Sequence, residues 1–233
     1  MVLDIQGLRV RYGRREAVCK VSLSVDAGEV VALYGYNGAG KSTLLRAVAG
    51  LARRAGGEVL LDGRDTRKAE ARRGLRYVPE SPVLFSHLSG EAHVRVFADA
   101  WRLDPDPAFE AAEALGLGPR MAQRPATWSQ GQRQKLMLAL ACLGDPTCVL
   151  LDDPVSALDP RSGREAMALM RGLAREHGTA VLLTGQRPRD SAAAVDRFVC
   201  LHEGRAVSEG VAAGRGEEAV ARAVEAALEA SWE

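Results

Sequence analysis

The chain has 233 residues, of which 47% are hydrophobic and 26% are charged, and its formal net charge is +1 at pH 7. This length and composition suit one globular domain, or one domain with two lobes, with a substantial core. The near-neutral charge and the lack of a long basic block argue against nucleic acid as a partner. No apolar run approaches the roughly 18 residues that span a bilayer, and the N-terminus lacks a signal-peptide pattern. We therefore expect a cytoplasmic protein that reaches a membrane only through a partner.

The four cysteines lie in apolar stretches and lack the spacing of metal ligands. They are Cys19, Cys142, Cys148 and Cys200. Buried, reduced thiols are therefore expected in preference to a zinc site or disulfides.

Two antiparallel strands are predicted at the start of the chain. Val, Leu and Ile alternate or cluster over residues 2–10 and 17–25, on either side of a turn at residues 13–15. Tyr12 ends the first strand, where its ring could stack on an adenine or could simply complete the strand. Its position leaves both interpretations open.

The strongest motif follows the apolar run of residues 30–33 and precedes the helical pattern of residues 44–49. It fits the phosphate-loop pattern of Gly, four residues, Gly, Lys and Ser/Thr. Its residues are Gly35, Tyr36, Asn37, Gly38, Ala39, Gly40, Lys41, Ser42 and Thr43. The backbone N–H groups of such a loop, together with the positive end of the following helix, bind phosphate oxygens. We therefore expect a nucleotide site in which Lys41 reaches the β- and γ-phosphates and Ser42 holds Mg²⁺.

A helical lobe is predicted for residues 80–146, inserted in an α/β core formed by residues 1–79 and 147–214. Within the lobe, apolar residues recur at i, i+3, i+4 and i+7, which is one face of a helix. The residues of that face are Val94, Phe97, Ala98 and Trp101. Asp104-Pro105 is expected to begin the next helix, and His93 is interpreted as a surface or packing residue.

A further helix is predicted to begin at Ser129, which is well placed as its N-cap. The apolar face of this helix would hold Leu136, Leu140 and Leu143. The apolar strand that follows, residues 148–151, leads directly into Asp152-Asp153. A carboxylate at the C-terminal end of a buried strand lies at the sheet edge where ligands bind. Asp152 is therefore expected to hold Mg²⁺ through water, with helix capping as the weaker alternative.

The rest of the chain continues the α/β alternation. A helix is expected to start at residues 156–160 and to end at Gly178, before a buried strand at residues 180–183. Residues 198–205 predict a closing hairpin. The tail, residues 215–233, is predicted as an amphipathic helix that packs on the body, with contact to another subunit as the alternative.

In this order, the motifs resemble those of the ATP-binding subunit of an ATP-binding-cassette (ABC) transporter over nearly the whole chain. Tyr12 matches the adenine-stacking aromatic residue, and residues 35–43 match the phosphate loop. Residues 128–132, WSQGQ, match the family signature, which is usually Leu-Ser-Gly-Gly-Gln. Residues 149–153 match the apolar strand that ends in Asp-Glu, and residues 156–159 match the loop after it. The resemblance implies a P-loop NTPase core with an antiparallel β subdomain and an inserted α-helical subdomain.

The resemblance also implies a head-to-tail dimer that sandwiches two ATP molecules and their Mg²⁺. Each ATP would be held by the phosphate loop of one subunit and by Ser129, Gly131 and Gln132 of the other. The first turn of a helix suits a γ-phosphate because it offers free N–H groups and a partial positive charge. Dimer closure on ATP would drive an integral membrane transporter subunit, whose cytoplasmic helix is expected to dock near residues 80–91.

Three positions around the expected γ-phosphate depart from the family pattern. Glu80 replaces the usual Gln, although it could still ligate Mg²⁺, and it is similar to the residue of some exporter subgroups. Asp153 replaces the Glu that polarises the attacking water. Gln186 replaces the usual His, and its amide can donate a hydrogen bond but carries no charge. Because the shorter Asp153 would miss the reach of roughly 2.6–3.2 Å that general-base catalysis needs, we expect tight ATP binding and poor hydrolysis.

The leading interpretation is therefore an energy-coupling ATPase subunit of a transporter, with export favoured by Glu80 and by the short C-terminal segment. In a heterodimer, Ser129 and Gly131 could still complete a competent site on a second cassette. Three alternatives stay open. The first is an active homodimer that tolerates the substitutions, the second is a nucleotide-gated regulatory cassette that does not hydrolyse ATP, and the third is a soluble cassette protein outside transport.

Overall fold

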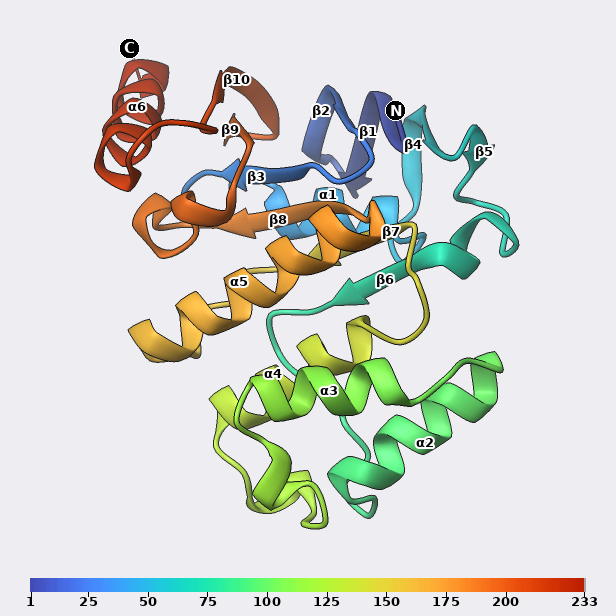
Figure 1. Ribbon diagram of the computed structural model, residues 1–233. Coiled ribbons are helices and arrows are strands. Elements are labelled where there is room, and N and C mark those ends of the chain that lie inside the picture. Colours follow the sequence, from blue (N-terminus) through green and yellow to red (C-terminus); the bar gives the residue numbers. More distant parts are fainter. Residues whose placement is uncertain (233) are drawn as a thin grey trace.

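The computed structural model describes residues 1–232, so residue 233, the last of the predicted tail segment, lies outside the described part of the chain. Two sheets form an α/β core, and a separate group of helices lies below it in Figure 1. The smaller sheet is antiparallel and has the order β2-β1-β4-β5. Its strands are β1 (Leu3–Tyr12), β2 (Arg15–Val25), β4 (Arg54–Leu61) and β5 (Arg64–Asp65). The two strands predicted at the start of the chain are thus confirmed.

The larger sheet has the order β10-β9-β3-β8-β7-β6 and is parallel except at its β9–β10 edge. Its strands are β3 (Val30–Tyr34), β6 (Leu75–Val78), β7 (Cys148–Leu151), β8 (Ala180–Gly185), β9 (Arg197–His202) and β10 (Arg205–Val211). Strands β3, β7 and β8 are buried along their whole length, as continuous apolar runs predict. Because β3, β6, β7 and β8 are parallel, the segments that follow them meet at one edge of the sheet.

The larger sheet divides the hydrophobic core into two parts, one on each of its faces. Alternate side chains of β3 point to opposite sides, so Val31 and Leu33 pack with the antiparallel sheet while Val30 and Ala32 pack with the helical side. Helix α1 (Lys41–Val48) lies in the first of these cores, between the two sheets. Helices α5 (Pro160–His177) and α6 (Glu217–Glu229) lie in the second. The tail helix therefore packs on the body, as predicted.

The helical lobe consists of α2 (Gly90–Trp101), α3 (Asp106–Ala114) and α4 (Gln130–Ala141), with short 3₁₀ turns between α3 and α4. Ser129 is the N-cap of α4, as predicted. Two boundaries differ from the prediction. Helix α3 begins at Asp106 because Asp104 forms a turn, in which its carboxylate accepts the Asp106 N–H at 3.0 Å. Leu143 lies beyond the end of α4, although it is buried in the same core.

Helix α5 begins within its predicted range, whereas strand β4 begins earlier than predicted. Helix α5 starts at Pro160, because the Asp159 carboxylate caps it by accepting N–H groups of the first turn at 3.0 Å. The apolar run before the turn at residues 62–63 predicts only a short strand at residues 58–61, but β4 starts at Arg54, since pairing with β1 extends it through a Gly-rich stretch of low strand propensity. Of the four cysteines, three are buried, whereas Cys19 is partly exposed, so the prediction of burial is wrong for Cys19.

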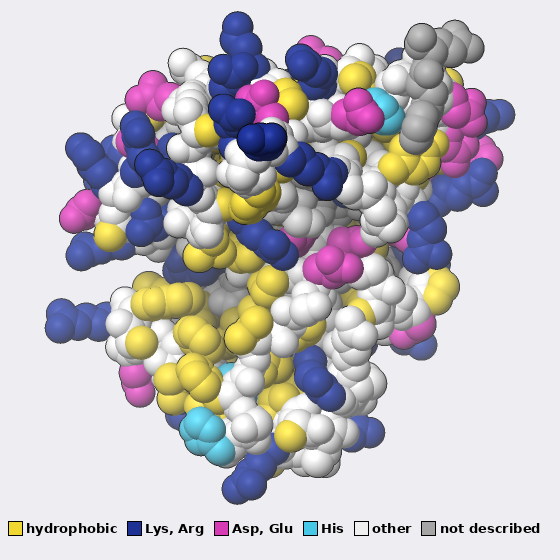
Figure 2. Space-filling model, turned by 180° about the vertical axis from the view of Figure 1, so that it is seen from behind, with side chains coloured by type: hydrophobic (Ala, Val, Ile, Leu, Met, Phe, Trp, Pro, Cys, Tyr) yellow, Lys and Arg dark blue, Asp and Glu magenta, His cyan; other side chains and the backbone are white. Residues whose placement is uncertain are grey.

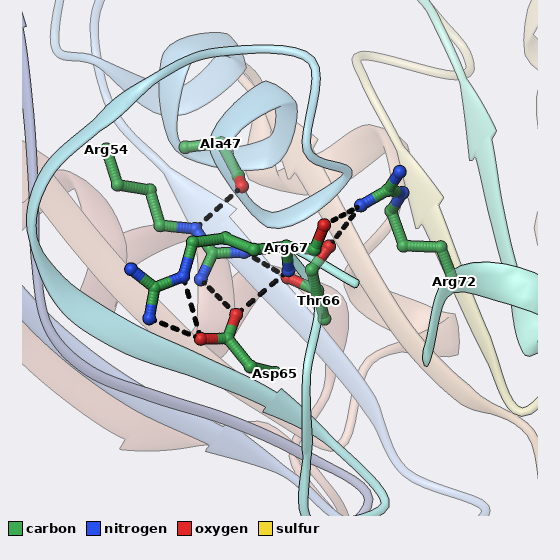
Figure 3. Close-up of polar contacts among 6 residues, drawn as sticks. All are labelled: Ala47, Arg54, Asp65, Thr66, Arg67 and Arg72. Carbon is green, nitrogen blue, oxygen red and sulfur yellow. Dashed lines mark hydrogen bonds and ion pairs between the residues drawn. The ribbon is translucent and has the colours of Figure 1, made fainter. Parts of the chain in front are cut away.

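A polar network fixes the end of the α1 helix to the antiparallel subdomain (Figure 3). The Arg54 side chain, which is 4% exposed, donates to the Ala47 carbonyl at the end of α1 and to Asp65 at 3.0 Å. It also contacts the Thr66 hydroxyl. Hydrogen bonds from Arg67 and the charge of Arg54 lower the pKa of Asp65 to about 2. The C-terminal end of the helix that follows the phosphate loop is therefore anchored to the antiparallel subdomain.

Candidate nucleotide-binding site

The phosphate loop spans the gap between the end of β3 at Tyr34 and the start of α1 at Lys41. Gly38 and Gly40 adopt the left-handed φ angles of 81° and 102°, which L side chains rarely adopt. A Cβ atom at Gly40 would also lie 2.3 Å from the carbonyl oxygen of Ala17. The loop can thus take this path only with glycine at position 40, and the path leads its backbone into the N-terminus of a helix.

Lys41 lies along the loop and is only 8% exposed. Its ammonium donates to the carbonyl of Gly35 at 2.7 Å and to the carbonyl of Tyr36 at 3.1 Å. Burial lowers the pKa of Lys41, and the nearby carboxylates of Asp153, Asp152 and Glu80 oppose this shift. A buried cation is therefore held where the loop curls around it.

The Asp152 carboxylate accepts hydrogen bonds from hydroxyl groups on three different strands or helices. Its Oδ1 accepts from Ser42 Oγ at 2.8 Å and from Thr184 Oγ1 at 2.9 Å, and its Oδ2 accepts from Tyr77 at 3.0 Å. The carboxylate is 1% exposed. Hydroxyl and carboxylate oxygens are the hard ligands that Mg²⁺ prefers, so the contact between Ser42 and Asp152 fits a Mg²⁺ site.

Asp153 follows Asp152 with a left-handed φ of 47°. Its backbone N–H donates to Thr184 Oγ1 at 2.9 Å, and its carboxylate accepts from the Gln186 amide at 3.2 Å. Burial, with the negative charge of Glu80 second, raises the pKa of Asp153. The Asp153 carboxylate therefore points toward the tip of β8, where Gln186 binds it.

A cavity of about 390 Å³ brings these parts together, and its size is typical of small-molecule sites. It is lined by Tyr12, Arg15, Ala17, Asn37, Gly38, Ala39, Gly40, Lys41, Ser42, Thr43, Glu80, Asp152, Asp153, Thr184 and Gln186. Gly35 contributes its carbonyl to Lys41 without being part of this lining. Three lining residues, Arg15, Ala17 and Thr184, are not among the predicted site residues, although Arg15 lies in the turn after Tyr12.

The signature residues lie elsewhere in the chain, at the start of α4 in the helical lobe. Ser129 Oγ accepts the Gln132 N–H at 3.2 Å, and the Gln132 side chain accepts the Ser129 N–H at 3.0 Å, which is a capping box. Gly131 packs closely on the loop before α5, since a Cβ there would lie 2.8 Å from the Ala157 carbonyl oxygen. These residues do not line the cavity of their own chain.

Comparison with known proteins agrees with this geometry. The family model described as ABC transporter matches residues 18–156, more than half of the chain. The chain belongs to the ABC transporter family. It is 36% identical over 204 residues to an aliphatic sulfonates import ATP-binding protein of Pseudomonas aeruginosa, covering 87% of this chain and 72% of the relative.

Solved ABC structures share the fold. The structure of an ATP binding subunit of an ABC transporter superposes with a TM-score of 0.85 at 28% identity and covers 97% of this chain and 100% of that chain. The dimeric structure of MJ0796, a bacterial ABC transporter cassette, gives a TM-score of 0.82 at 25% identity, over 91% and 100% of the two chains. The fold is therefore that of an ABC ATPase cassette, a family that binds ATP with Mg²⁺ and couples its hydrolysis to transport.

The helical lobe of this cassette exposes apolar side chains beside the segment that leaves the core. Figure 2 shows hydrophobic side chains gathered over the lobe, below the charged core. The docking cluster, as we call it, consists of Phe85, Phe97 and Trp101, and Phe85 and Trp101 are more than two-fifths exposed. The rings of Phe85, Phe97 and Trp101 follow one another at centroid distances of 6.4 and 5.4 Å. Arg76 of β6 lies 4.6 Å over the Trp101 ring.

His93 fixes this segment from inside the lobe. It is fully buried, and its Nε2 accepts the Phe85 N–H at 2.8 Å. Its other ring nitrogen lies 2.7 Å from the Ser89 carbonyl, to which it donates as neutral imidazole. Burial lowers the pKa of His93, which favours this neutral form. The interpretation of His93 as a packing residue is confirmed.

Proposed function

We propose that this ABC transporter ATP-binding subunit binds Mg-ATP in the cavity of about 390 Å³, at a dimer interface, and thereby drives transport by a membrane partner. The observation that carries the proposal is the convergence of the phosphate loop with Asp152 and Glu80, which come from different strands, on one cavity. A glycine-rich turn without a ligand would not need a buried carboxylate such as Asp152 beside its helix.

The lining assigns a role to each part of the site. Tyr12 would stack on the adenine, and the loop N–H groups with Lys41 would bind the phosphates. Ser42, Asp152 and Glu80 would hold Mg²⁺, directly or through water. When bound, Mg²⁺ polarises the phosphate oxygens and neutralises charge that develops on them.

The same cavity supports a weak hydrolytic activity. Asp153 stands where the family pattern has the Glu that polarises the attacking water, but it is one carbon shorter and its carboxylate is hydrogen-bonded to Gln186. Gln186 supplies no positive charge to a γ-phosphate. We propose that the site formed on this phosphate loop holds ATP and hydrolyses it slowly.

The capping box at Ser129 supports a role for α4 in a second subunit. It satisfies the Ser129 and Gln132 N–H groups and leaves the N–H groups of residues 130 and 131 without an intrahelical acceptor. These groups, with the helix dipole, would bind the γ-phosphate of ATP held by a second cassette. If that cassette carries Glu and His at the altered positions, the heterodimer would have one competent site.

We propose that a cytoplasmic helix of an integral membrane subunit binds the docking cluster near residues 80–91, which would place the cassette on the inner face of the membrane. None of the helices in residues 1–232 is long and apolar enough to cross a membrane. For the direction of transport, Glu80 favours export, whereas the Pseudomonas relative is named as an import protein. Transport in vesicles that contain the co-purified membrane subunit decides between the two directions.

The first experiment compares ATP binding by the purified chain, Lys41→Ala and the exposed-lysine control Lys68→Ala. We expect Lys41→Ala to lose about 100-fold or more in affinity and Lys68→Ala to bind like the native chain. Equal binding by all three would refute the assigned site. ATP-driven dimerisation without phosphate release would favour the regulatory cassette, and co-purification with a polytopic membrane protein would favour a transporter over a soluble cassette.

A further inference from the structure

Tyr77 lies on β6, the neighbour of the strand that leads into Asp152, and its hydroxyl contacts the Asp152 carboxylate. Strands β6 and β7 are parallel neighbours, with Tyr77 beside Leu150 in the register. The Tyr77 hydroxyl donates to Asp152 Oδ2 at 3.0 Å and accepts a hydrogen bond from the Arg46 guanidinium. Arg46 belongs to α1, so the contacts connect the phosphate-loop helix through Tyr77 to the carboxylate.

The two oxygens of Asp152 are therefore used differently. Oδ1 accepts from Ser42 and Thr184, which both line the cavity, whereas Oδ2 accepts from Tyr77, which does not. A carboxylate held at one oxygen could still rotate about its Cβ–Cγ bond, which is a broad torsion. A donor on Oδ2 removes that freedom. Burial raises the pKa of Tyr77 to about 12, so the hydroxyl stays protonated at neutral pH.

We propose that Tyr77 is a positioning residue for the Mg²⁺ of bound Mg-ATP. By holding Oδ2, it presents Oδ1 of Asp152 to Ser42 and to the cavity, without touching nucleotide itself. The contact has the form of an outer-shell hydrogen bond, which orients a ligand that holds a metal. The inference rests on the proposed Mg-ATP site.

The test is Tyr77→Phe, which removes only the hydroxyl. A fluorescent ATP analogue is titrated at a series of free Mg²⁺ concentrations, and in EDTA. We expect the Mg²⁺ concentration for half-maximal enhancement of binding to rise about tenfold, the lower end of the range for outer-shell partners. Affinity in EDTA should stay within twofold, because Tyr77 does not line the cavity.

Tyr34→Phe is the matched control. Its hydroxyl is also buried and bonds Ser191 at 2.9 Å, away from Asp152. We expect Tyr34→Phe to lose about as much stability as Tyr77→Phe, while its nucleotide binding keeps the native dependence on Mg²⁺. Arg46→Gln, at an exposed position, gives a second variant in case Tyr77→Phe does not fold, and we expect a two- to threefold shift in the same direction.

The outcomes separate the two proposals. A native chain whose nucleotide binding does not respond to Mg²⁺ would overturn the proposed site. A native chain that responds, with Tyr77→Phe and Arg46→Gln responding identically to it, would overturn the role of Tyr77. The proposed role of Tyr77 is supported if the Mg²⁺ concentration for half-maximal enhancement rises in Tyr77→Phe and Arg46→Gln but not in Tyr34→Phe.

Discussion

Restoring the family residues at positions 153 and 186 should raise the rate of ATP hydrolysis. Glu at position 153 extends the carboxylate by one carbon–carbon bond, about 1.5 Å. General-base contact needs a heavy-atom distance of roughly 2.6–3.2 Å, a window only about 0.6 Å wide. A change of about 1.5 Å exceeds that width, so if Glu at position 153 reaches the attacking water, the native Asp153 does not. A general base typically raises the reaction rate by 10²–10⁴-fold. We expect a gain of about 10²-fold for Asp153→Glu/Gln186→His, which corresponds to about 2.7 kcal/mol of activation free energy.

The assay is phosphate release at saturating Mg-ATP, by the native chain, both single variants and the double variant. Asp153→Gln/Gln186→His is the matched control, because Gln has the length of Glu without its carboxylate. We expect this control to stay at the native rate. A native chain that already turns over as fast as the double variant, or a control that gains as much, would refute the reasoning and favour an active homodimer that tolerates Asp153 and Gln186.

Three further predictions concern the parts around the site. Gly131→Ala places a Cβ 2.8 Å from a backbone oxygen, so we expect ATP-driven dimerisation, measured by light scattering, to weaken at least tenfold while ATP binding to the monomer is kept. Arg54→Met removes a guanidinium that is 4% exposed and with it the hydrogen bonds to Asp65 and to the Ala47 carbonyl, so it should cost about 3 kcal/mol in urea unfolding, with a smaller loss for the exposed Arg67→Ala. Neutral His93 has a lowered pKa, so its contribution to stability is present above pH 6.5 and is lost as the pH falls below that value. The protection factor of the Phe85 N–H, which compares its exchange rate with that of an unstructured amide at the same pH, should therefore fall below pH 6.5, and an unchanged protection factor would contradict the assigned hydrogen bond.

Much of the core and of the candidate site could be predicted because both are local in sequence. A buried parallel strand is a continuous apolar run, and the residues that follow it lie at the sheet edge. The phosphate loop, Asp152 and Gln186 each follow such a run, so all three are predicted to lie at one edge of the sheet. The capping box of α4 is equally local, since Ser129 and Gln132 are three residues apart.

The rest depends on which strands become neighbours. Tyr77 and Thr184 meet Asp152 only because β6 and β8 lie on either side of β7, and that order is set by tertiary packing. A lone Tyr in a short strand carries no sign of a carboxylate partner. The start of β4 at Arg54 could not be predicted for a similar reason. Residues 54–57 have low strand propensity, and they are stabilised as a strand by pairing with β1 and by the Arg54 network.

Glu80 and Phe85 connect the cavity to the docking cluster within one short segment. Glu80 lines the nucleotide cavity, and Phe85, five residues later, belongs to the exposed aromatic cluster. The Phe85 backbone is hydrogen-bonded to buried His93, so this end of the segment moves with the lobe. The other end follows β6, which is part of the core sheet. A shift of Glu80 toward Mg-ATP must therefore be taken up between a fixed strand and the lobe that carries Phe85, and we expect the lobe to rotate on the core when nucleotide binds.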